Sequence, residues 1–389
     1  MPKIFISLKE IKSNILLKLI LGLTIFSVYF MFNSTVILSI EYYGNPYRYG
    51  IMHLVWVTLG FLFMGFFYHI EISKLKKFTF IVFFLSAIFL FLLSLAKFFP
   101  CDNSLSFAPC TKGAVRWFVL NPKPLPEIPF IGTITFQPSE LAKLSFVLLL
   151  AYFFSSVKYD IKEKFKKAAL FCLPIILFVF FQPNKSTAMI LFFIFCSIYY
   201  VNGEDLKKIY ILVAGFIAMF IFFVIFNSYS FSRLSTYLDS NVNESENYHQ
   251  KQVMISLGSG GVTGLGLGKS RQKFSFLPEI NSDSIFALVG EETGFIGTTI
   301  LSFVFFSIVF QGFKIALNQK EKYNKFLAVG ISSWFGIQTL INLFSMTDLI
   351  PLTGIPLPIV SYGGSSTIFV MIALGILLNL SKSVYEKKY

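Results

Sequence analysis

The stretch RQKFSFLPEINSDSIFALVGEE, residues 271–292, passes from a basic, aromatic segment into an apolar one. Asp283 stands at the junction, where water would give way to hydrocarbon. Asp is a common N-cap residue of helices, whereas a charged side chain at membrane depth is a functional hypothesis by default. Both interpretations require that the apolar half of this stretch begins a membrane span.

The composition of the whole chain is that of a membrane protein. Of its 389 residues, 55% are hydrophobic and 14% are charged, and the mean hydropathy is +0.70. A soluble domain carries about 25% charged residues. Apolar runs of about 20 residues recur, which is the length that a helix needs to cross a bilayer. Because only helices or closed barrels satisfy the backbone in lipid, and strand-like alternation is absent, we expect an all-α polytopic membrane protein.

Ten transmembrane helices are expected within one domain, residues 1–389. Their approximate ranges are 16–38, 50–70, 78–98, 138–156, 168–183, 186–201, 208–227, 284–313, 325–346 and 361–381. The eighth is longer than a bilayer requires and is interrupted by glycines. Residues 1–18 are basic with apolar residues at helical spacing, which predicts a short interfacial helix. No small-residue cleavage site follows a short apolar stretch there, so no cleaved signal peptide is expected.

Lysine-rich connections predict the orientation. With ten spans, the N-terminus, 71–77, 157–167, 202–208, 314–325 and the tail 382–389 all share one side. The positive-inside rule makes that side cytoplasmic. These orientation charges explain the net charge of +13, so no nucleic-acid partner is expected. The two long polar segments, 99–136 and 228–282, are then extracytoplasmic, and the polar chemistry gathers at the outer face.

The four cysteines divide into two kinds. Cys101 and Cys110 share an outer loop, where an oxidising exterior permits a disulfide without requiring one. Cys172 and Cys196 lie inside spans and are expected to be apolar packing residues. No cysteine or histidine spacing resembles a metal site.

The motif FQPSELAKL, residues 136–144, places two opposite charges at the outer end of the fourth span. Glu140 and Lys143 are three positions apart, so they share a helix face. One interpretation is a charge-neutral pair that only stabilises the helix end. The other is that the pair positions Asp283 or a substrate head group. Gln137, with the Pro and Ser that follow it, predicts the start of this helix.

Two further stretches suggest anion binding. KGAVRWF, residues 112–118, sets Arg116 beside Trp117. A guanidinium binds phosphate oxygens bidentately, but a Trp–Arg pair is also an ordinary interfacial anchor. LGSGGVTGLGLGKS, residues 257–270, lacks the spacing of a Walker loop and predicts a flexible re-entrant turn.

Lys269, Arg271 and Lys273 follow that turn and add positive charge on the outer side, against the positive-inside trend. They suggest an anionic partner at the outer surface, such as a lipid diphosphate. Glu291 and Glu292 lie about two turns into the eighth span, where at least one must be paired or protonated.

PLTGIPLPIVSYGGSS, residues 351–366, contains three prolines and paired glycines at an outer turn. This composition predicts a rigid loop that leads into the tenth span. Ser361, Tyr362 and Ser365 could donate hydrogen bonds into a cavity. Alternatively, the paired glycines only allow close helix packing.

Taken together, these motifs resemble the SEDS family of bacterial membrane proteins, the group of FtsW, RodA and SpoVE. GAVRWF, QPSELAKL, LGSGG, DSIFALVGEETGFIG and GIPLPIVSYGGSS occur in the family order and on the same side of the membrane. Within the family, GLGKSRQKFSFLPE and QTLIN, residues 338–342, are more similar to the division-type FtsW pattern than to the elongation-type RodA pattern.

The resemblance implies a peptidoglycan glycosyltransferase of the bacterial cytoplasmic membrane, acting at the division septum. Such an enzyme polymerises lipid II, an undecaprenyl diphosphate-linked glycan, and works with a class B penicillin-binding protein and other divisome proteins. The resemblance places the catalytic acid on Asp283. Residues expected to bind substrate or support the site are Arg116, Gln137, Glu140, Lys143, Lys269, Arg271, Lys273 and Ser361. No cofactor is certain, and a divalent cation, Mg or Mn, remains open.

Two departures from the family pattern stand near these motifs. The family usually reads QPDLGT where this chain reads QPNKST, so Asn184 replaces an acid and Lys185 adds a cation that could bind phosphate. The family's HTD is NSD here, with Asn281 and Ser282 before Asp283. A lipid II flippase or transporter, a RodA-like elongation polymerase and a scaffold that recruits division partners are the rival functions. No acidic or basic path toward the cytoplasmic side supports transport.

Overall fold

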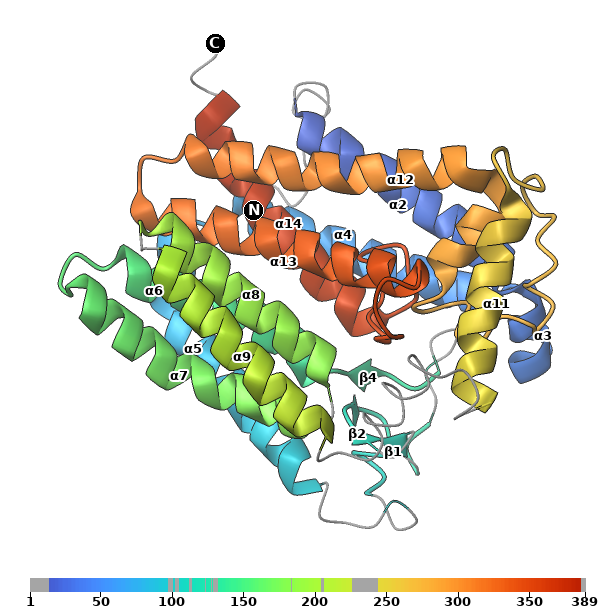
Figure 1. The fold of residues 1–389 in the computed structure, drawn as a ribbon, viewed down its shortest axis with the longest axis horizontal. Helices are drawn as coiled ribbons and strands as arrows, with labels where there is room; N and C mark the ends of the chain where they lie inside the picture. The colour runs from blue at the N-terminus through green and yellow to red at the C-terminus, as the bar shows by residue number, and fades with distance from the viewer. Residues whose placement is uncertain are drawn as a thin grey trace.

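The computed structural model describes residues 14–96, 101, 105–111, 114–122, 124–126, 128, 132–182, 184–203, 206–225 and 244–385. Figure 1 shows a bundle whose helices mostly run along its long axis. The predicted all-α fold class is confirmed. The predicted interfacial helix over 1–18 lies largely outside the described residues.

Twelve helices are described. Their bounds are α2 Ile15–Ser34, α3 Val36–Tyr43, α4 Arg48–His69, α5 Ile72–Ala96, α6 Pro138–Ser155, α7 Ile161–Phe181, α8 Lys185–Val201, α9 Leu206–Ile225, α11 Glu244–Gly260, α12 Ile285–Leu317, α13 Lys322–Met346 and α14 Gly364–Tyr385. Helices therefore occupy all ten ranges that the sequence predicts to span the membrane. Neither α3 nor α11 is predicted by the sequence.

The helices differ in how well they suit a bilayer. Among the described residues, seven are long and apolar enough to cross a membrane, namely α2, α4, α5, α6, α12, α13 and α14. α8 is a shorter apolar helix. α7 begins with the lysine-rich KEKFKK segment, which lowers the hydropathy of its first turns. The number of ten spans remains a prediction.

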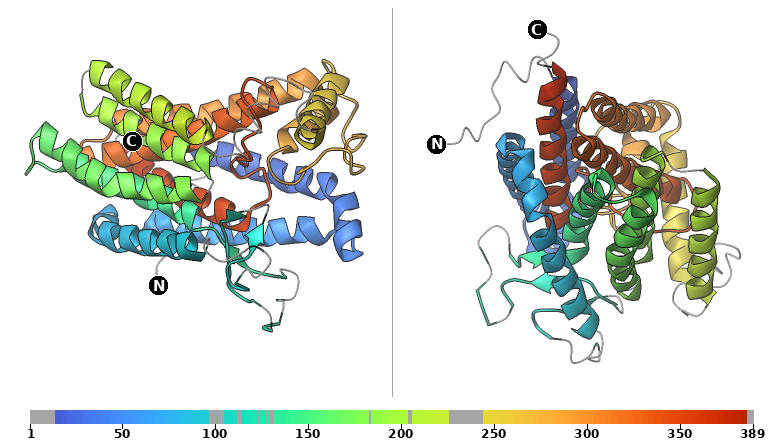
Figure 2. Two further views of the ribbon diagram at one scale, coloured as in Figure 1. Left: turned by 60° about the horizontal axis from the view of Figure 1, so that its bottom comes forward. Right: turned by 90° about the vertical axis from the view of Figure 1, so that its left-hand side faces the viewer.

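The centre of the bundle is formed by α6 and α13. In an 18-residue apolar stretch of each helix, 83% and 89% of the residues are buried. α13 packs against α12, α6 and α8, while α14 packs against α4 (Figure 2). The α4–α14 crossing is close because Gly375 faces the backbone of Met64, where a Cβ would stand 2.5 Å from the carbonyl oxygen. α13 and α6 therefore fix the position of any polar group that they carry.

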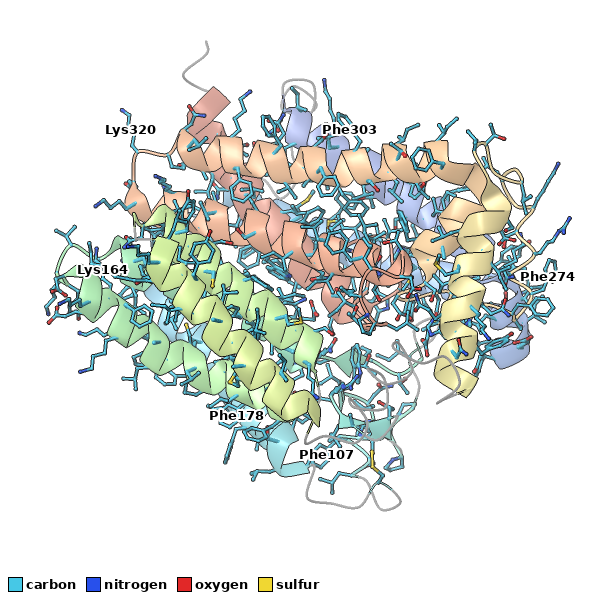
Figure 3. All side chains as sticks on the ribbon, viewed as in Figure 1. Phe107, Lys164, Phe178, Phe274, Phe303 and Lys320 are labelled. Carbon is cyan, nitrogen blue, oxygen red and sulfur yellow. A yellow bond between two sulfur atoms is a disulfide. The ribbon has the colours of Figure 1, made fainter. Side chains whose placement is uncertain are left out.

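The two ends of the bundle carry different residues. Figure 3 shows Lys164 and Lys320 at one end and Phe274 at the opposite end. This arrangement agrees with the predicted orientation, in which 157–167 and 314–325 are cytoplasmic and 228–282 is outside. α11 and α3 lie at the same end as Phe274.

The segment 99–136, which is predicted to be extracytoplasmic, contains two short antiparallel strand pairs. β1 Cys110–Thr111 pairs with β2 Ala114–Val115, and β3 Phe118–Val119 pairs with β4 Thr135–Phe136. Cys101 and Cys110 form a disulfide, so the pairing that the sequence left open is made. Of the second outer segment, 228–243 lies outside the described residues, and α11 occupies the part that follows.

Candidate functional site

Asp283 lies two residues before α12, next to the N-cap position, and is 6% exposed. The N-cap of α12 is Ser284, whose side chain makes no capping hydrogen bond. Ser282 Oγ donates to Asp283 Oδ1 at 3.1 Å. The N-cap interpretation of Asp283 is therefore wrong, because the helix begins one residue later than that interpretation requires. The carboxylate is buried just before the N-terminal end of a membrane helix, and the N-cap position belongs to its neighbour.

A proline-containing segment, residues 353–362 and hereafter the roof loop, lies beside this carboxylate. A Cβ built on Gly354 would stand 4.0 Å from Asp283 Oδ2, so the chain passes close to the carboxylate there. Tyr362 N donates to Asn281 O at 2.7 Å, two residues before Asp283. The roof loop thus lies close to Asp283 and is hydrogen-bonded to the segment that leads to it.

Asn342 of α13 joins Asp283 to the roof loop. Its Nδ2 donates to Asp283 O at 2.9 Å and to Ile355 O at 2.8 Å. One turn earlier on the same helix face, Gln338 Nε2 donates to Pro356 O at 3.0 Å. Two consecutive carbonyl groups of the roof loop are therefore held by two amide side chains of α13.

Glu140 and Lys143 form the predicted pair on α6, and both are buried, at 4% and 1% exposure. Lys143 Nζ lies 2.8 Å from Glu140 Oε1 and donates to Gln338 Oε1 at 2.8 Å. The ammonium also lies 5.0 Å from the Trp334 ring centroid. Glu140 Oε2 has no hydrogen-bond partner among the described residues. Gln338 also donates to the roof loop, so this one side chain connects the Glu140–Lys143 pair to the loop beside Asp283.

Arg116 approaches the turn between α7 and α8, where its Nε donates to Gln182 O at 3.4 Å. Gln182 in turn donates to Leu90 O at 2.8 Å. Asn184 is the N-cap of α8 and accepts from Thr187 N at 3.4 Å. Asn and Asp cap helices about equally well. Replacement of the family's acid therefore keeps the local fold of this turn.

Lys185 is half-buried at the start of α8, and its neighbours contact other parts of the site. Asn184 Nδ2 donates to Ser139 Oγ at 3.5 Å, beside Glu140. Ser186 Oγ donates to Thr353 O at 3.1 Å, beside Gly354. Lys185 thus stands between one residue that contacts α6 and one that contacts the roof loop.

The sequence suggests that the three cations after the glycine-rich turn are all available to an anionic partner. The structure shows that one of them, Lys273, is bonded within the protein. Lys273 Nζ lies 3.9 Å from Glu292 Oε1 and donates to Asn33 Oδ1 at 3.1 Å. Lys273 is therefore bonded to a buried carboxylate, whereas Lys269 and Arg271 have exposed side chains.

Glu291 and Glu292 anchor this loop, which confirms that buried acids here are paired. Glu291 accepts from Ser270 Oγ and from Arg271 N, the latter at 2.9 Å. Glu292 accepts from Asn33 Nδ2 at 2.6 Å and from Gly268 N at 3.0 Å. Backbone N–H groups thus reach both carboxylates, together with the Ser270 hydroxyl at Glu291 and with the Asn33 amide and Lys273 ammonium at Glu292.

The interruption of α12 makes this anchoring possible. Gly294 has φ 68° and ψ −166°, a region that only glycine occupies readily. Beyond the break, Phe295 N and Ile296 N donate to Gly261 O and Val262 O at 2.9 and 3.1 Å. The predicted glycine interruption of the eighth span is therefore a sharp break that receives the glycine-rich turn.

Replacing Gly294 by Ala is expected to destabilise the protein strongly. A Cβ there would stand 2.3 Å from Gly264 N and 2.5 Å from Val262 O, in addition to the backbone strain. Strain at such a position alone costs about 1–3 kcal/mol. The matched control is Gly22→Ala, where a Cβ meets nothing within 4 Å. In detergent, the unfolding temperature should fall strongly for Gly294→Ala and stay near the parental value for Gly22→Ala. Equal unfolding temperatures for the two variants would contradict this account.

Ser361, predicted to bind substrate or support the site, makes a bond within the roof loop. Its hydroxyl accepts from Leu357 N at 2.8 Å inside the roof loop, and the side chain is 3% exposed. Ser365 Oγ accepts from Gln137 N and donates to Thr135 O, both at 3.1 Å. Both hydroxyls are therefore hydrogen-bonded to backbone groups of the protein. Ser361 thus supports the loop from within, and the Gln137 backbone is fixed at the start of α6.

Three residues of the site have no role in the sequence-based prediction. Gln338 and Asn342 belong to QTLIN, which served only as a family signature, although two amides one turn apart in an apolar span are a usable signal. His249 of α11 lies with its Nε2 2.8 Å from Ser284 Oγ. It could not be found from the sequence, because α11 itself is not predicted.

Comparison with known proteins places the chain among bacterial cell-cycle membrane proteins. A family model described as cell cycle protein, covering FtsW, RodA and SpoVE, matches residues 14–386. A probable peptidoglycan glycosyltransferase FtsW of Geobacter sulfurreducens is 30% identical over 97% of this chain and 97% of its own length. The stage V sporulation protein E of Bacillus subtilis is 36% identical over 65% of this chain and 70% of its own length.

Solved structures share the fold. The rod shape determining protein RodA of Thermus thermophilus has a TM-score of 0.66 at 22% identity, with 95% of this chain and 96% of that chain covered. A chain from a peptidoglycan synthase complex, described for its coordination of polymerisation and crosslinking, has a TM-score of 0.72 at 22% identity, with 95% and 98% covered.

Proposed function

Because the chain belongs to the FtsW/RodA/SpoVE family, we propose that it is a peptidoglycan glycosyltransferase that polymerises lipid II at the outer face of the cytoplasmic membrane. One observation carries this proposal. Asp283 is a buried carboxylate at the outer end of a membrane helix, and it lies under a loop fixed by α13 without capping that helix. A relative of the same length, 30% identical, is named for this activity.

Asp283 acts as general base in the proposed mechanism. The acceptor is a sugar hydroxyl of one lipid II, and the donor is a lipid diphosphate-linked glycan. The carboxylate takes the hydroxyl proton as the oxygen bonds to the anomeric carbon, while the bond from that carbon to the diphosphate oxygen breaks. Positioned proton transfer of this kind contributes about 10²–10⁴-fold to the rate. A base at the bilayer surface suits substrates whose tails stay in lipid.

The leaving diphosphate needs charge stabilisation more than a strong acid. Two cations at the α7–α8 turn are candidates for this role. Arg116 donates a hydrogen bond to the turn, and Lys185 follows the turn at the start of α8. Lys143 is shielded by its pairing with Glu140, so its role is to hold Gln338. Lys269 and Arg271 remain available at the outer surface to attract anionic substrate.

A divalent cation would have to be held largely by the substrate. In the part of the chain that the structure describes, no three His, Cys, Asp or Glu side chains cluster as a metal site. Mg²⁺ commonly binds through one or two carboxylates together with substrate phosphates and water. Asp283 and the diphosphate fit that pattern, and the ion would supply positive charge to the leaving group.

Lys185→Leu should weaken the use of lipid II without unfolding the protein. Losing one half-buried cation near the donor phosphates is worth on the order of 1 kcal/mol, or about fivefold in KM at low salt. The effect should shrink as salt is raised, because ions screen partly exposed charges. Lys320→Leu, at the opposite end of the bundle, is the matched control. An unchanged KM for Lys185→Leu at low salt would remove Lys185 from the site.

Septal synthesis with a class B penicillin-binding protein is the cellular role that we propose. The support is that several relatives of similar length bear the name FtsW. Divisome proteins would then be further partners. Depleting the protein from cells should produce filaments if the role is septal and rounded cells if the role is elongation.

A lipid transporter fits the distribution of charge less well. Among the described residues, the buried carboxylates are Glu140, Asp283, Glu291 and Glu292. All four lie near the outer ends of α6 and α12. A path across the bilayer would need polar groups at the midplane and beyond. The experiment that separates the two functions is incubation of the purified protein with lipid II, because only the polymerase makes glycan strands.

A further inference from the structure

Four carbonyl groups of the roof loop accept hydrogen bonds from side chains of membrane helices. They are Thr353 O from Ser186 (3.1 Å), Ile355 O from Asn342 (2.8 Å), Pro356 O from Gln338 (3.0 Å) and Ile359 O from Ser27 (2.7 Å). Ser186 belongs to α8, Gln338 and Asn342 to α13, and Ser27 to α2. The loop is therefore held by three helices, and Ser27 is the donor at its Ile359 end.

Ser27, the α2 residue that donates to the roof loop, also contacts a buried histidine. Ser27 Oγ lies 2.7 Å from His53 Nε2 of α4, and both side chains are 0% exposed. A hydroxyl has one proton, and Ser27 gives it to Ile359 O. Ser27 Oγ must then accept from His53, which assigns the ring proton to Nε2. His53 Nδ1 has no hydrogen-bond partner among the described residues.

Ile359 is a residue that needs such a restraint. Its φ is 68°, which is an outlier for a β-branched side chain, and it is 2% exposed. Strained backbone persists only where surrounding contacts hold it. Three residues later, Tyr362 N donates to Asn281 O at 2.7 Å, beside Asp283. Release of Ile359 would therefore loosen the part of the roof loop that reaches the catalytic segment.

We propose that His53 is a positioning residue that acts through Ser27 to hold the Ile359 end of the roof loop over Asp283. The arrangement resembles that at Gln338, which also bonds to the roof loop and accepts a hydrogen bond from a further residue, Lys143. Its effect on catalysis rests on the proposed function, but its effect on the loop does not.

Hydrogen exchange of the purified protein tests the loop directly. Leu357 N, Ser361 N and Tyr362 N are all hydrogen-bonded in the native loop. His53→Leu and Ser27→Ala should each speed exchange in a peptide covering 355–362 by about tenfold, corresponding to the loss of one buried restraint. His53→Gln keeps an amide donor and should restore most of the protection. Unaltered exchange in both His53→Leu and Ser27→Ala would overturn the proposal, whether or not the protein polymerises lipid II.

Ser86→Ala is the matched control for loss of a buried bond between membrane helices. Ser86 Oγ lies 2.8 Å from Ser145 Oγ, both side chains are 0% exposed, and neither touches the roof loop in the contacts described. The rate of hydrogen exchange over 355–362 in Ser86→Ala should equal that of the parent protein.

Lipid II polymerisation then separates positioning from general stability. His53→Leu should lower kcat by about tenfold with little change in KM, and His53→Gln should recover it. Combining Ser27→Ala with His53→Leu should cost no more than Ser27→Ala alone, because both remove one connection. Additive losses, or an equal loss in Ser86→Ala, would contradict a specific role for His53. Lack of activity in the parent protein would count against the proposed function, while hydrogen exchange would still support or overturn the role of His53 in holding the loop.

Discussion

Asp283→Asn is expected to abolish glycan polymerisation by the purified protein while leaving its folding intact. The amide is nearly the same size as the carboxylate and can still accept from Ser282 Oγ, so the packing under the roof loop is kept. It cannot take a proton from the attacking hydroxyl. Loss of a general base lowers rates by about 10²–10⁴-fold, which places the variant below detection in a gel assay of glycan strands.

The control for this change is an outer carboxylate outside the site. Glu41 is exposed on α3, and its Oε1 accepts from Ser275 Oγ at 2.7 Å. Glu41→Gln makes the same chemical change and should polymerise at the parental rate. If both variants lose activity together, the loss reflects outer-face charge or folding and not a base at position 283.

Lys143→Met is expected to have the second largest effect, on stability as well as on activity. It leaves Glu140 as an unpaired buried carboxylate, and breaking a buried ion pair in this way costs about 3–5 kcal/mol. Changing both residues, as Glu140→Gln with Lys143→Met, removes both charges and should recover much of that stability. Thermal unfolding in detergent measures these differences.

The double variant also decides what the pair does. Gln338 would keep its bond from Trp334 Nε1 at 2.9 Å but lose the one from Lys143. If the pair positions the roof loop through Gln338, the double variant should be folded yet at least about tenfold slower in polymerisation. A stable double variant with parental activity would show that the pair only stabilises the helix.

The membrane helices could be predicted from the sequence because apolar runs of span length have few alternatives. The start of α6 at Pro138 and the end of α13 at Met346 coincide with the prediction. Glu140 and Lys143 were found because their spacing puts opposite charges on one helix face. The N-cap interpretation of Asp283 was wrong because helix ends depend on which adjacent residue takes the helical conformation, and composition does not decide between neighbours.

The connections between these elements could not be predicted. Lys273 was expected to be a surface cation, but the break at Gly294 folds the glycine-rich turn back onto Glu292. Gln338 and Asn342 gain their importance only from the position of the roof loop. Such contacts join residues far apart in the chain, and one sequence carries no information about that proximity.

The most direct measurement is lipid II binding and lipid II polymerisation on one purified sample of the Asp283→Asn variant, beside the parent protein. A transpeptidase partner, if present, should be inactivated so that only strand formation is observed. The account predicts that the variant binds lipid II as the parent does and forms no glycan strands. Strands formed by the variant at the parental rate would contradict the assignment of Asp283 as the catalytic base.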